Sequence, residues 1–137
     1  MIKSHTKGLS GIVLVNLFAF LAHMALEPVV FTEIVQGVVN LTSSYLVNTL
    51  GVLSVCVALI YLNKMFESII GFVYLALSVL KMMVLYIFLN PTNAAGKVFP
   101  IDAAAFLLPF GFNLLLELLF TVKLLKINDL VDSLRKE

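Results

Sequence analysis

The sequence predicts an all-α integral membrane protein, a four-helix transmembrane bundle with its N- and C-termini on the cytoplasmic side. Of its 137 residues, 61% are hydrophobic and 12% are charged, and the mean hydropathy is +1.09. Soluble domains carry roughly twice that share of charge. Four apolar runs are also long enough to cross a bilayer. If each run crosses once, the basic residues outside them gather on one side of the membrane. We therefore expect a lipid bilayer to surround the chain.

The lengths of the four predicted spans follow from the thickness of the hydrocarbon core. This core is about 30 Å thick, and an α-helix needs about 20 residues to cross it. The apolar runs that meet this length cover residues 9–31, about 45–62, 69–89 and about 103–125. They lack the period-two alternation of barrel strands, which favours helices. We expect all four spans to form a single transmembrane domain, 1–137, without a soluble second domain.

The first span begins like a secretory signal peptide. Lys3 and Lys7 precede an apolar stretch, but this stretch is long and has no clean small-residue cleavage site before Glu27 and Pro28. We therefore predict that it is retained as a signal-anchor helix.

The segments between the spans contain residues that end helices or form turns. Pro28 and Gly37 follow the first span, Asn63 follows the second, and Asn90-Pro91 closes the third. Segment 32–44 is too apolar for an ordinary loop, so we expect it either to extend a flanking helix or to lie along the outer interface.

The C-terminal tail, 127–137, has an amphipathic pattern. Leu130, Val131 and Leu134 fall on one face of a helix, and charged residues fall around the rest. This pattern predicts a short amphipathic helix at the cytoplasmic surface.

The orientation follows from lysine and arginine, which concentrate in loops that remain in the cytoplasm. In a four-span arrangement only Lys97 falls on the outer side. The basic residues of the other side are Lys3, Lys7, Lys64, Lys123, Lys126, Arg135 and Lys136. We therefore place both termini in the cytoplasm, and we expect a multi-pass protein of the bacterial inner membrane.

Polar residues inside the spans are the candidate functional residues. A charged group at the bilayer centre costs about 2.5 to 3.5 kcal/mol on insertion scales, so such groups usually face the bundle and have partners. The intramembrane candidates are His23, Glu27, Lys81, Asn113 and Glu117, with Asn16 as a further polar residue of the first span.

The depth of these residues predicts two polar layers. At about 1.5 Å per residue, His23 and Lys81 lie roughly 20 Å from the cytoplasmic ends of their spans, and Asn16 and Glu117 lie roughly 10 Å from theirs. Two interpretations follow. The first is a proton or cation path in which Lys81 and Glu117 change partners or protonation, with His23 and Glu27 near the outer mouth.

The second interpretation, which we favour, is structural. Lys81 would pair with Glu27 or Glu117, while Asn16, Asn113 and His23 would form hydrogen bonds across helices and fix the packing.

The sequence offers no recognisable catalytic, cofactor or metal site. It contains no glycine-rich phosphate loop, no nucleophile beside a base and no Cys/His cluster. Its single cysteine, Cys56, lies in an apolar run and is expected to be a packing residue. The net charge of +1 does not favour a nucleic-acid partner. We expect no enzymatic activity, no catalytic residues, no cofactor and no metal.

The third and fourth spans resemble a family of small four-span membrane proteins from Bacteroidota that is similar to ATP synthase protein I. The residues that carry the resemblance are Leu80-Lys81-Met82-Met83, Asn90-Pro91, Leu108-Pro109-Phe110 and Leu114-Leu115-Leu116-Glu117, running into Lys123-Leu124-Leu125. The resemblance covers only the second half of the chain, and His23 and Glu27 have no counterpart in it. It implies an accessory protein of the rotary ATP synthase, which assembles the membrane ring or supplies a cation to it. Among the candidate functional residues, the resemblance extends only to Lys81 and Glu117.

Two functions remain open. The first is a non-enzymatic accessory or assembly subunit that holds a larger membrane complex, for which we expect other membrane protein subunits or further copies of the chain as partners. The alternative is a small proton- or cation-conducting component of a transporter or channel.

Overall fold

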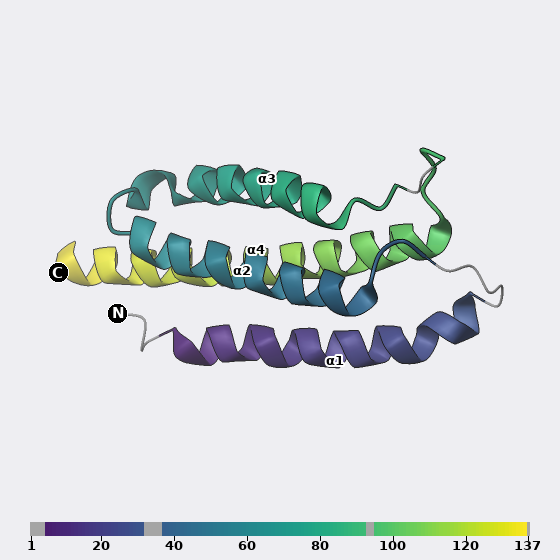
Figure 1. The fold of residues 1–137 in the computed structure, drawn as a ribbon. Coiled ribbons are helices and arrows are strands. Elements are labelled where there is room, and N and C mark those ends of the chain that lie inside the picture. The colour runs from purple at the N-terminus through teal and green to yellow at the C-terminus, as the bar shows by residue number, and fades with distance from the viewer. Residues whose placement is uncertain (1–4, 32–36, 93–94, 137) are drawn as a thin grey trace.

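The computed structural model describes residues 5–31, 37–92 and 95–136, and within these ranges it contains helices and no strand (Figure 1). The predicted all-α fold is confirmed. The elements in chain order are α1 (Thr6–Val30), α2 (Leu41–Leu62), the 3-10 turn η2 (Glu67–Ile69), α3 (Ile70–Leu89) and α4 (Pro100–Lys136). By length and composition, four of the described helices are apolar enough to cross a membrane.

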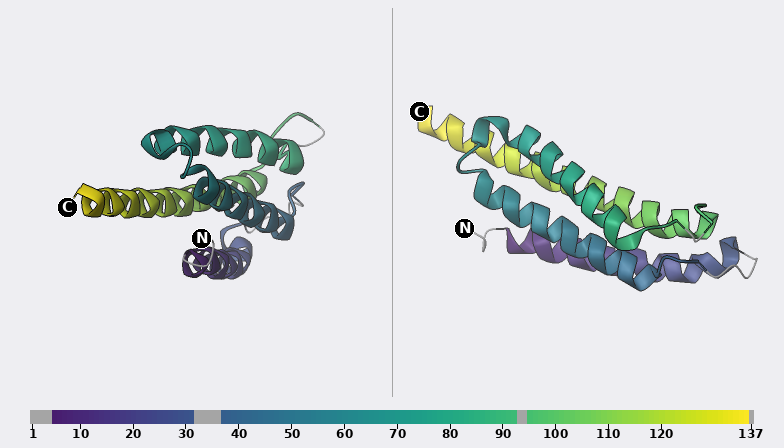
Figure 2. Two further views of the ribbon diagram at one scale, coloured as in Figure 1. Left: turned by 90° about the vertical axis from the view of Figure 1, so that its left-hand side faces the viewer. Right: turned by 45° about the horizontal axis from the view of Figure 1, so that its top comes forward.

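The four long helices form an elongated bundle with α2 and α4 at its centre. α2 contacts each of the other three, and α1 and α3 pack on opposite sides of the α2/α4 pair (Figure 1 and Figure 2). α1 begins and α4 ends at the same end of the bundle, which we call the terminal end. The connections from α1 to α2 and from α3 to α4 lie at the opposite end, which we call the far end.

Basic residues are distributed unevenly between these two ends. Lys97 lies in the segment just before α4, at the far end. The other described lysines and arginines outside the centre of the bundle lie toward the terminal end, and they are Lys7, Lys64, Lys123, Lys126, Arg135 and Lys136. The two ends therefore differ in charge in the way that the sequence predicts.

The start of α2 decides part of segment 32–44, which was expected either to extend a flanking helix or to lie along the outer interface. The helix begins at Leu41, because the Asn40 side chain accepts a hydrogen bond from Ser43 N–H at 3.1 Å and so caps the first turn. Residues 41–44 thus extend the second helix. Residues 32–36 of the same segment lie outside the described residues.

The fourth helix is longer than predicted at both ends. It starts at Pro100, where the fixed φ of proline suits a first helical position, and Asp102 places a carboxylate in the first turn. It then continues to Lys136, since no glycine or proline follows Gly111. The prediction of a helical tail is confirmed for residues 127–136, but the prediction that this helix is short is wrong. The tail is helical and amphipathic, but it continues α4 and protrudes beyond α2 and α3 (Figure 1).

Two apolar clusters form the core toward the terminal end. The first joins α1, α2 and α4 and contains Ile12, Val52, Cys56, Ile60 and Phe120. The second joins α2, α3 and α4 and contains Val55, Leu59, Ile70, Tyr74 and Leu124. Cys56 is fully buried within the first cluster, as expected for a packing residue.

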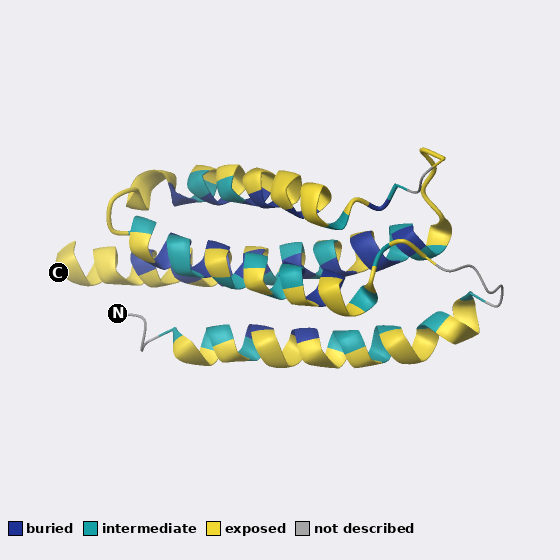
Figure 3. Cartoon of the chain, viewed as in Figure 1, coloured by how far each residue is buried: buried dark blue, intermediate teal, exposed yellow. Residues whose placement is uncertain are grey.

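The outward faces of the helices are exposed (Figure 3), and many of the side chains on them are large and apolar. Phe18 on α1 and Phe72 on α3 are each 75% exposed, and Phe88 is 74% exposed. Soluble monomers rarely expose apolar patches of this extent, so this surface fits contact with lipid or with other helices.

Candidate functional site: polar contacts inside the bundle

An ion pair between α3 and α4 lies at the centre of the bundle. Lys81 Nζ donates a hydrogen bond to Glu117 Oε1, and the Ser78 hydroxyl donates to Glu117 Oε2 at 3.3 Å. Glu117 is 0% exposed and Lys81 is 7% exposed. Ser78 and Lys81 are three residues apart on α3, so they share one helix face and together bind both oxygens of the carboxylate. The predicted pairing of Lys81 with Glu117, one of the two that we considered, is present.

The Lys81 side chain reaches Glu117 by passing over a glycine of α2. A Cβ atom added at Gly51 would lie 3.2 Å from Lys81 Cδ and 3.3 Å from Cγ, closer than ordinary packing allows. At its tip, Nζ lies 5.4 Å from the centroid of the Phe110 ring, within range of a cation–π interaction. The absence of a side chain at Gly51 thus leaves room for the lysine stem.

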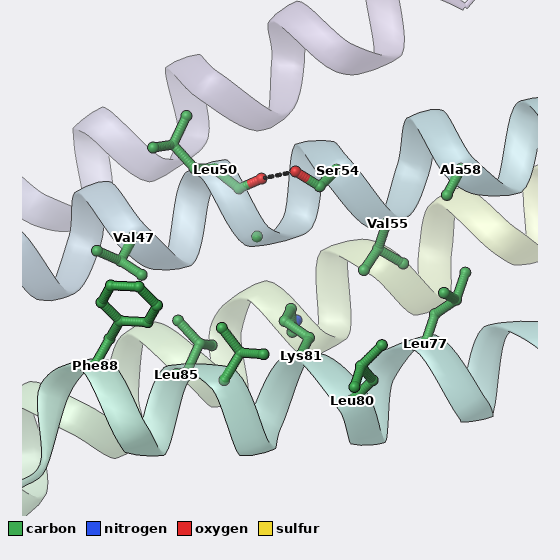
Figure 4. Close-up of a pocket in the computed structure, with 12 residues that line it drawn as sticks. Val47, Leu50, Ser54, Val55, Ala58, Leu77, Leu80, Lys81, Leu85 and Phe88 are labelled. Carbon is green, nitrogen blue, oxygen red and sulfur yellow. Dashed lines mark hydrogen bonds between the residues drawn. The ribbon is translucent and has the colours of Figure 1, made fainter.

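The same lysine stem forms part of the floor of a groove between α2 and α3 (Figure 4). The groove has a volume of about 410 Å³, and its walls are mainly aliphatic, with Phe88 closing one end. The ammonium group points away from the groove toward α4, where it meets Glu117. The groove therefore presents an apolar surface.

An amide pair joins α1 to α4. Asn16 Nδ2 donates to Asn113 Oδ1 at 2.8 Å, and Asn113 Nδ2 donates back to Asn16 Oδ1 at 2.8 Å. Each amide also donates to the carbonyl four residues earlier, Ile12 O at 2.9 Å and Pro109 O at 2.8 Å. Both residues are at most 3% exposed. These contacts fix α1 against α4 at one level.

Ser44 of α2 compensates for a proline in α4. Pro109 has no N–H, so it cannot donate to the carbonyl of Ala105 four residues earlier. The Ser44 hydroxyl donates to this carbonyl at 2.5 Å, and Ser44 is fully buried. A neighbouring helix thereby supplies the donor that a membrane-buried carbonyl needs. The role of Ser44 was not predicted from the sequence. A proline inside an apolar run does indicate that the carbonyl four residues earlier lacks its usual helical N–H donor.

His23 and Glu27 lie apart from the ion pair, toward the far end. His23 Nδ1 lies 3.1 Å from the Tyr45 hydroxyl, and His23 Nε2 lies 3.9 Å from Glu27 Oε2. The contacts do not follow the two predicted layers, in which His23 was grouped with Lys81 and Asn16 with Glu117. Depth counted along each helix neglects helix tilt and the reach of a lysine side chain, and the actual pairs are Lys81 with Glu117 and Asn16 with Asn113.

Two further polar contacts were not predicted. Asp102 is fully buried and its Oδ1 accepts a hydrogen bond from Val39 N–H at 2.8 Å, which ties the segment before α2 to the first turn of α4. Near the terminal end, Asn63 and Asn128 exchange amide hydrogen bonds of 2.9 and 2.7 Å. The second contact explains why α4 packs beyond the predicted span: its extension has a polar partner just after α2.

These contacts join the helices of the bundle to one another. Across residues 5–31, 37–92 and 95–136, no group of three His, Cys, Asp or Glu side chains is placed to hold a metal ion. Comparison of the chain with protein-family models, curated proteins and solved structures finds no match. The class of protein is given by the fold itself, four helices long and apolar enough to span a membrane, which is the architecture of a multi-pass membrane protein.

Proposed function

We propose that the chain is a non-enzymatic accessory or assembly subunit of a larger membrane complex. One observation carries the proposal: two pairs of buried polar side chains bind each other across helices, while the outward faces are apolar. Lys81 binds Glu117 and Asn16 binds Asn113. Such contacts fix the relative positions of helices, and the apolar outer faces remain for lipid or for the helices of other subunits.

We further propose a bacterial inner-membrane location with the terminal end in the cytoplasm. The support is the excess of lysine and arginine at that end, since basic loops are retained on the cytoplasmic side. A reporter fused after residue 137 or within 63–66 should be cytoplasmic, and one within 95–99 should be external. An external C-terminus would contradict the four-span arrangement.

For the identity of the complex, we propose the rotary ATP synthase. The support is the resemblance of the third and fourth spans to the four-span family similar to ATP synthase protein I, in which Lys81 and Glu117 are the residues carried over. In this chain the two residues bind each other at the centre of the bundle, where they hold α3 against α4.

Purification in mild detergent tests this proposal. A tagged chain should co-purify with ATP synthase membrane subunits, and a tagged unrelated four-span protein should not. Deletion of the chain should reduce the amount of assembled membrane ring. Normal ring assembly in the deletion strain, together with absence of ATP synthase subunits from the purified material, would exclude this complex.

The alternative is a proton- or cation-conducting component, and the buried Lys81–Glu117 pair is the observation that favours it. A conducting path needs groups that change protonation. The double change Lys81→Met with Glu117→Gln removes both titratable groups without leaving one unpaired. Conduction requires that this variant lose ion flux in proteoliposomes, whereas the accessory role requires that it retain its partners. Wild-type flux that the double change abolishes would replace the first proposal with the second.

A further inference from the structure

A cavity of about 530 Å³ lies between α1 and α4 toward the far end of the bundle. The Asn16–Asn113 amide pair holds the two helices together further toward the terminal end. Beyond this pair, both helices present small side chains to the space between them, and these are Ala19, Ala22 and Ala104. Tyr45 of α2 also lines the cavity. The cavity is therefore formed by two helices that are fixed at one level and carry alanines at the next.

The entrance to this cavity lies on the outer surface of the bundle. Leu26 on α1 and Leu108 on α4 both line the cavity, and they are 58% and 57% exposed. These leucines lie on the apolar outward surface of the bundle. A ligand would therefore enter sideways from the membrane.

The described residues of the lining combine aromatic rings with a single carboxylate. Phe31, Tyr45 and Phe112 contribute the rings, and Glu27 contributes the carboxylate. The Glu27 side chain is 30% exposed, so it remains accessible, whereas the His23 side chain is 8% exposed. Among the described residues that line the cavity there is no lysine or arginine. The nearest recorded ionic contact of Glu27 is His23 Nε2, at 3.9 Å.

We propose that this cavity binds a membrane-soluble organic cation, with its apolar body among the alanines and aromatic rings and its positive charge beside Glu27. Aromatic faces attract cations, and a carboxylate in a poorly hydrated setting attracts them more strongly than one in water. A volume of about 530 Å³ lies within the range of small-molecule sites.

The charge of the lining distinguishes this ligand from a membrane lipid. An amine-headed phospholipid also offers an ammonium group and apolar chains, but it would bring a phosphate close to the Glu27 carboxylate. The two negative charges would repel each other, and the described lining contains no lysine or arginine to neutralise the phosphate. A free cation without a phosphate fits the site better.

Two ions of equal shape and opposite charge test the proposal. Tetraphenylphosphonium is an apolar cation, and tetraphenylborate is its anionic counterpart. Titration calorimetry on the full chain in a neutral detergent should show saturable binding of tetraphenylphosphonium and none of tetraphenylborate. Equal binding of both ions would mean partition into the micelle or a site indifferent to charge, and it would overturn the proposal.

Matched variants locate the binding. Glu27→Gln should weaken tetraphenylphosphonium binding about tenfold, because it removes the carboxylate and keeps the side-chain shape. Glu67→Gln removes an exposed carboxylate at the opposite end of the bundle and should leave the affinity within about a factor of two of the wild type. Unchanged affinity in Glu27→Gln would overturn the assignment.

A second variant keeps the test valid if Glu27→Gln fails to fold. Ala104→Leu leaves the carboxylate in place and occupies part of the cavity, so it should weaken tetraphenylphosphonium binding while the helix content measured by circular dichroism is retained. Wild-type binding in Ala104→Leu would show that the cation binds elsewhere. Bilayer nanodiscs with and without phosphatidylethanolamine provide the lipid control. Displacement of the probe by this lipid would favour a lipid occupant and overturn the proposed free cation.

Discussion

The two halves of the bundle are held together by different kinds of contact. Toward the terminal end, two apolar clusters join all four helices around α2, and the Asn63–Asn128 amide pair is a hydrogen-bonded side-chain pair described there. Toward the far end, hydrogen bonds predominate: Asn16 with Asn113, Ser44 with the carbonyl of Ala105, and Asp102 with the backbone of the segment before α2. The α1/α4 cavity lies in this second half. The Lys81–Glu117 pair lies between the two halves.

This difference shows how a small membrane bundle specifies its packing. In lipid, an apolar side chain gains little by leaving the acyl chains for another helix, so apolar clusters contribute mainly shape and dispersion. Polar side chains have no comparable partner in lipid, so each hydrogen bond selects one neighbour and one register. The apolar half should therefore tolerate substitutions that preserve volume, whereas the polar half and the ion pair should depend on particular residues.

The largest effect is expected at the ion pair. Lys81→Met or Glu117→Gln alone should each cost about 3 kcal/mol, because a buried charge is left without its partner. The double change should cost less than either single change. Thermal or denaturant unfolding in detergent of the four proteins measures the coupling. If the two losses simply add, the pair contributes no coupling energy, and it does not hold α3 against α4.

A somewhat smaller effect is expected in the apolar half. Leu59 is fully buried, and Leu59→Ala should cost about 1 to 3 kcal/mol from the cavity it leaves. Leu17→Ala on the outward face of α1, where the side chain is 54% exposed, should be close to neutral and serves as the control. The same unfolding measurement applies. Equal losses at the two positions would mean that the cluster does not form.

The polar half should respond to a single amide with a still smaller loss. Asn16→Leu should cost about 0.6 to 2 kcal/mol, the usual range for a hydrogen bond between membrane helices, because Asn113 loses its partner. The double change with Asn113→Leu should recover part of this loss, since no amide is left unpaired. A double variant less stable than the sum of the single changes would contradict the pairing.

The sequence predicted the number and type of helices because lipid imposes a length and composition that can be read directly from it. It did not predict helix ends that depend on single contacts. Because Asn40 caps it, α2 begins before the start of the apolar run. Asn128 forms a hydrogen bond with Asn63 beyond the predicted end of the fourth span.

Partners inside the bundle were predicted only in part. Charge limited the partner of Lys81 to Glu27 or Glu117, and the structure shows that it is Glu117. Asn16 with Asn113, and Ser44 with a carbonyl freed by Pro109, depend on how the helices are rotated and tilted. No periodicity in the chain specifies those angles, since the outer and inner faces of the helices are both apolar. Exposure to lipid thus removes the polar stripe by which a soluble helix reveals its orientation.

The smallest effect is expected at Gly51, where the two halves meet the ion pair. Gly51→Ala would place a methyl group 3.2 Å from Lys81 Cδ, so the lysine stem must move and its contact with Glu117 should weaken. We expect a loss of about 0.5 to 1 kcal/mol, as for mild overpacking. Gly111→Ala is the matched control, because a Cβ there meets nothing within 4 Å. Gains in helix propensity should be small at both sites, since membrane helices remain helical when the bundle separates. A loss at Gly51 that is absent at Gly111 would establish that close approach to Lys81 is what requires the glycine; identical behaviour at the two sites would show that the lysine stem adjusts freely.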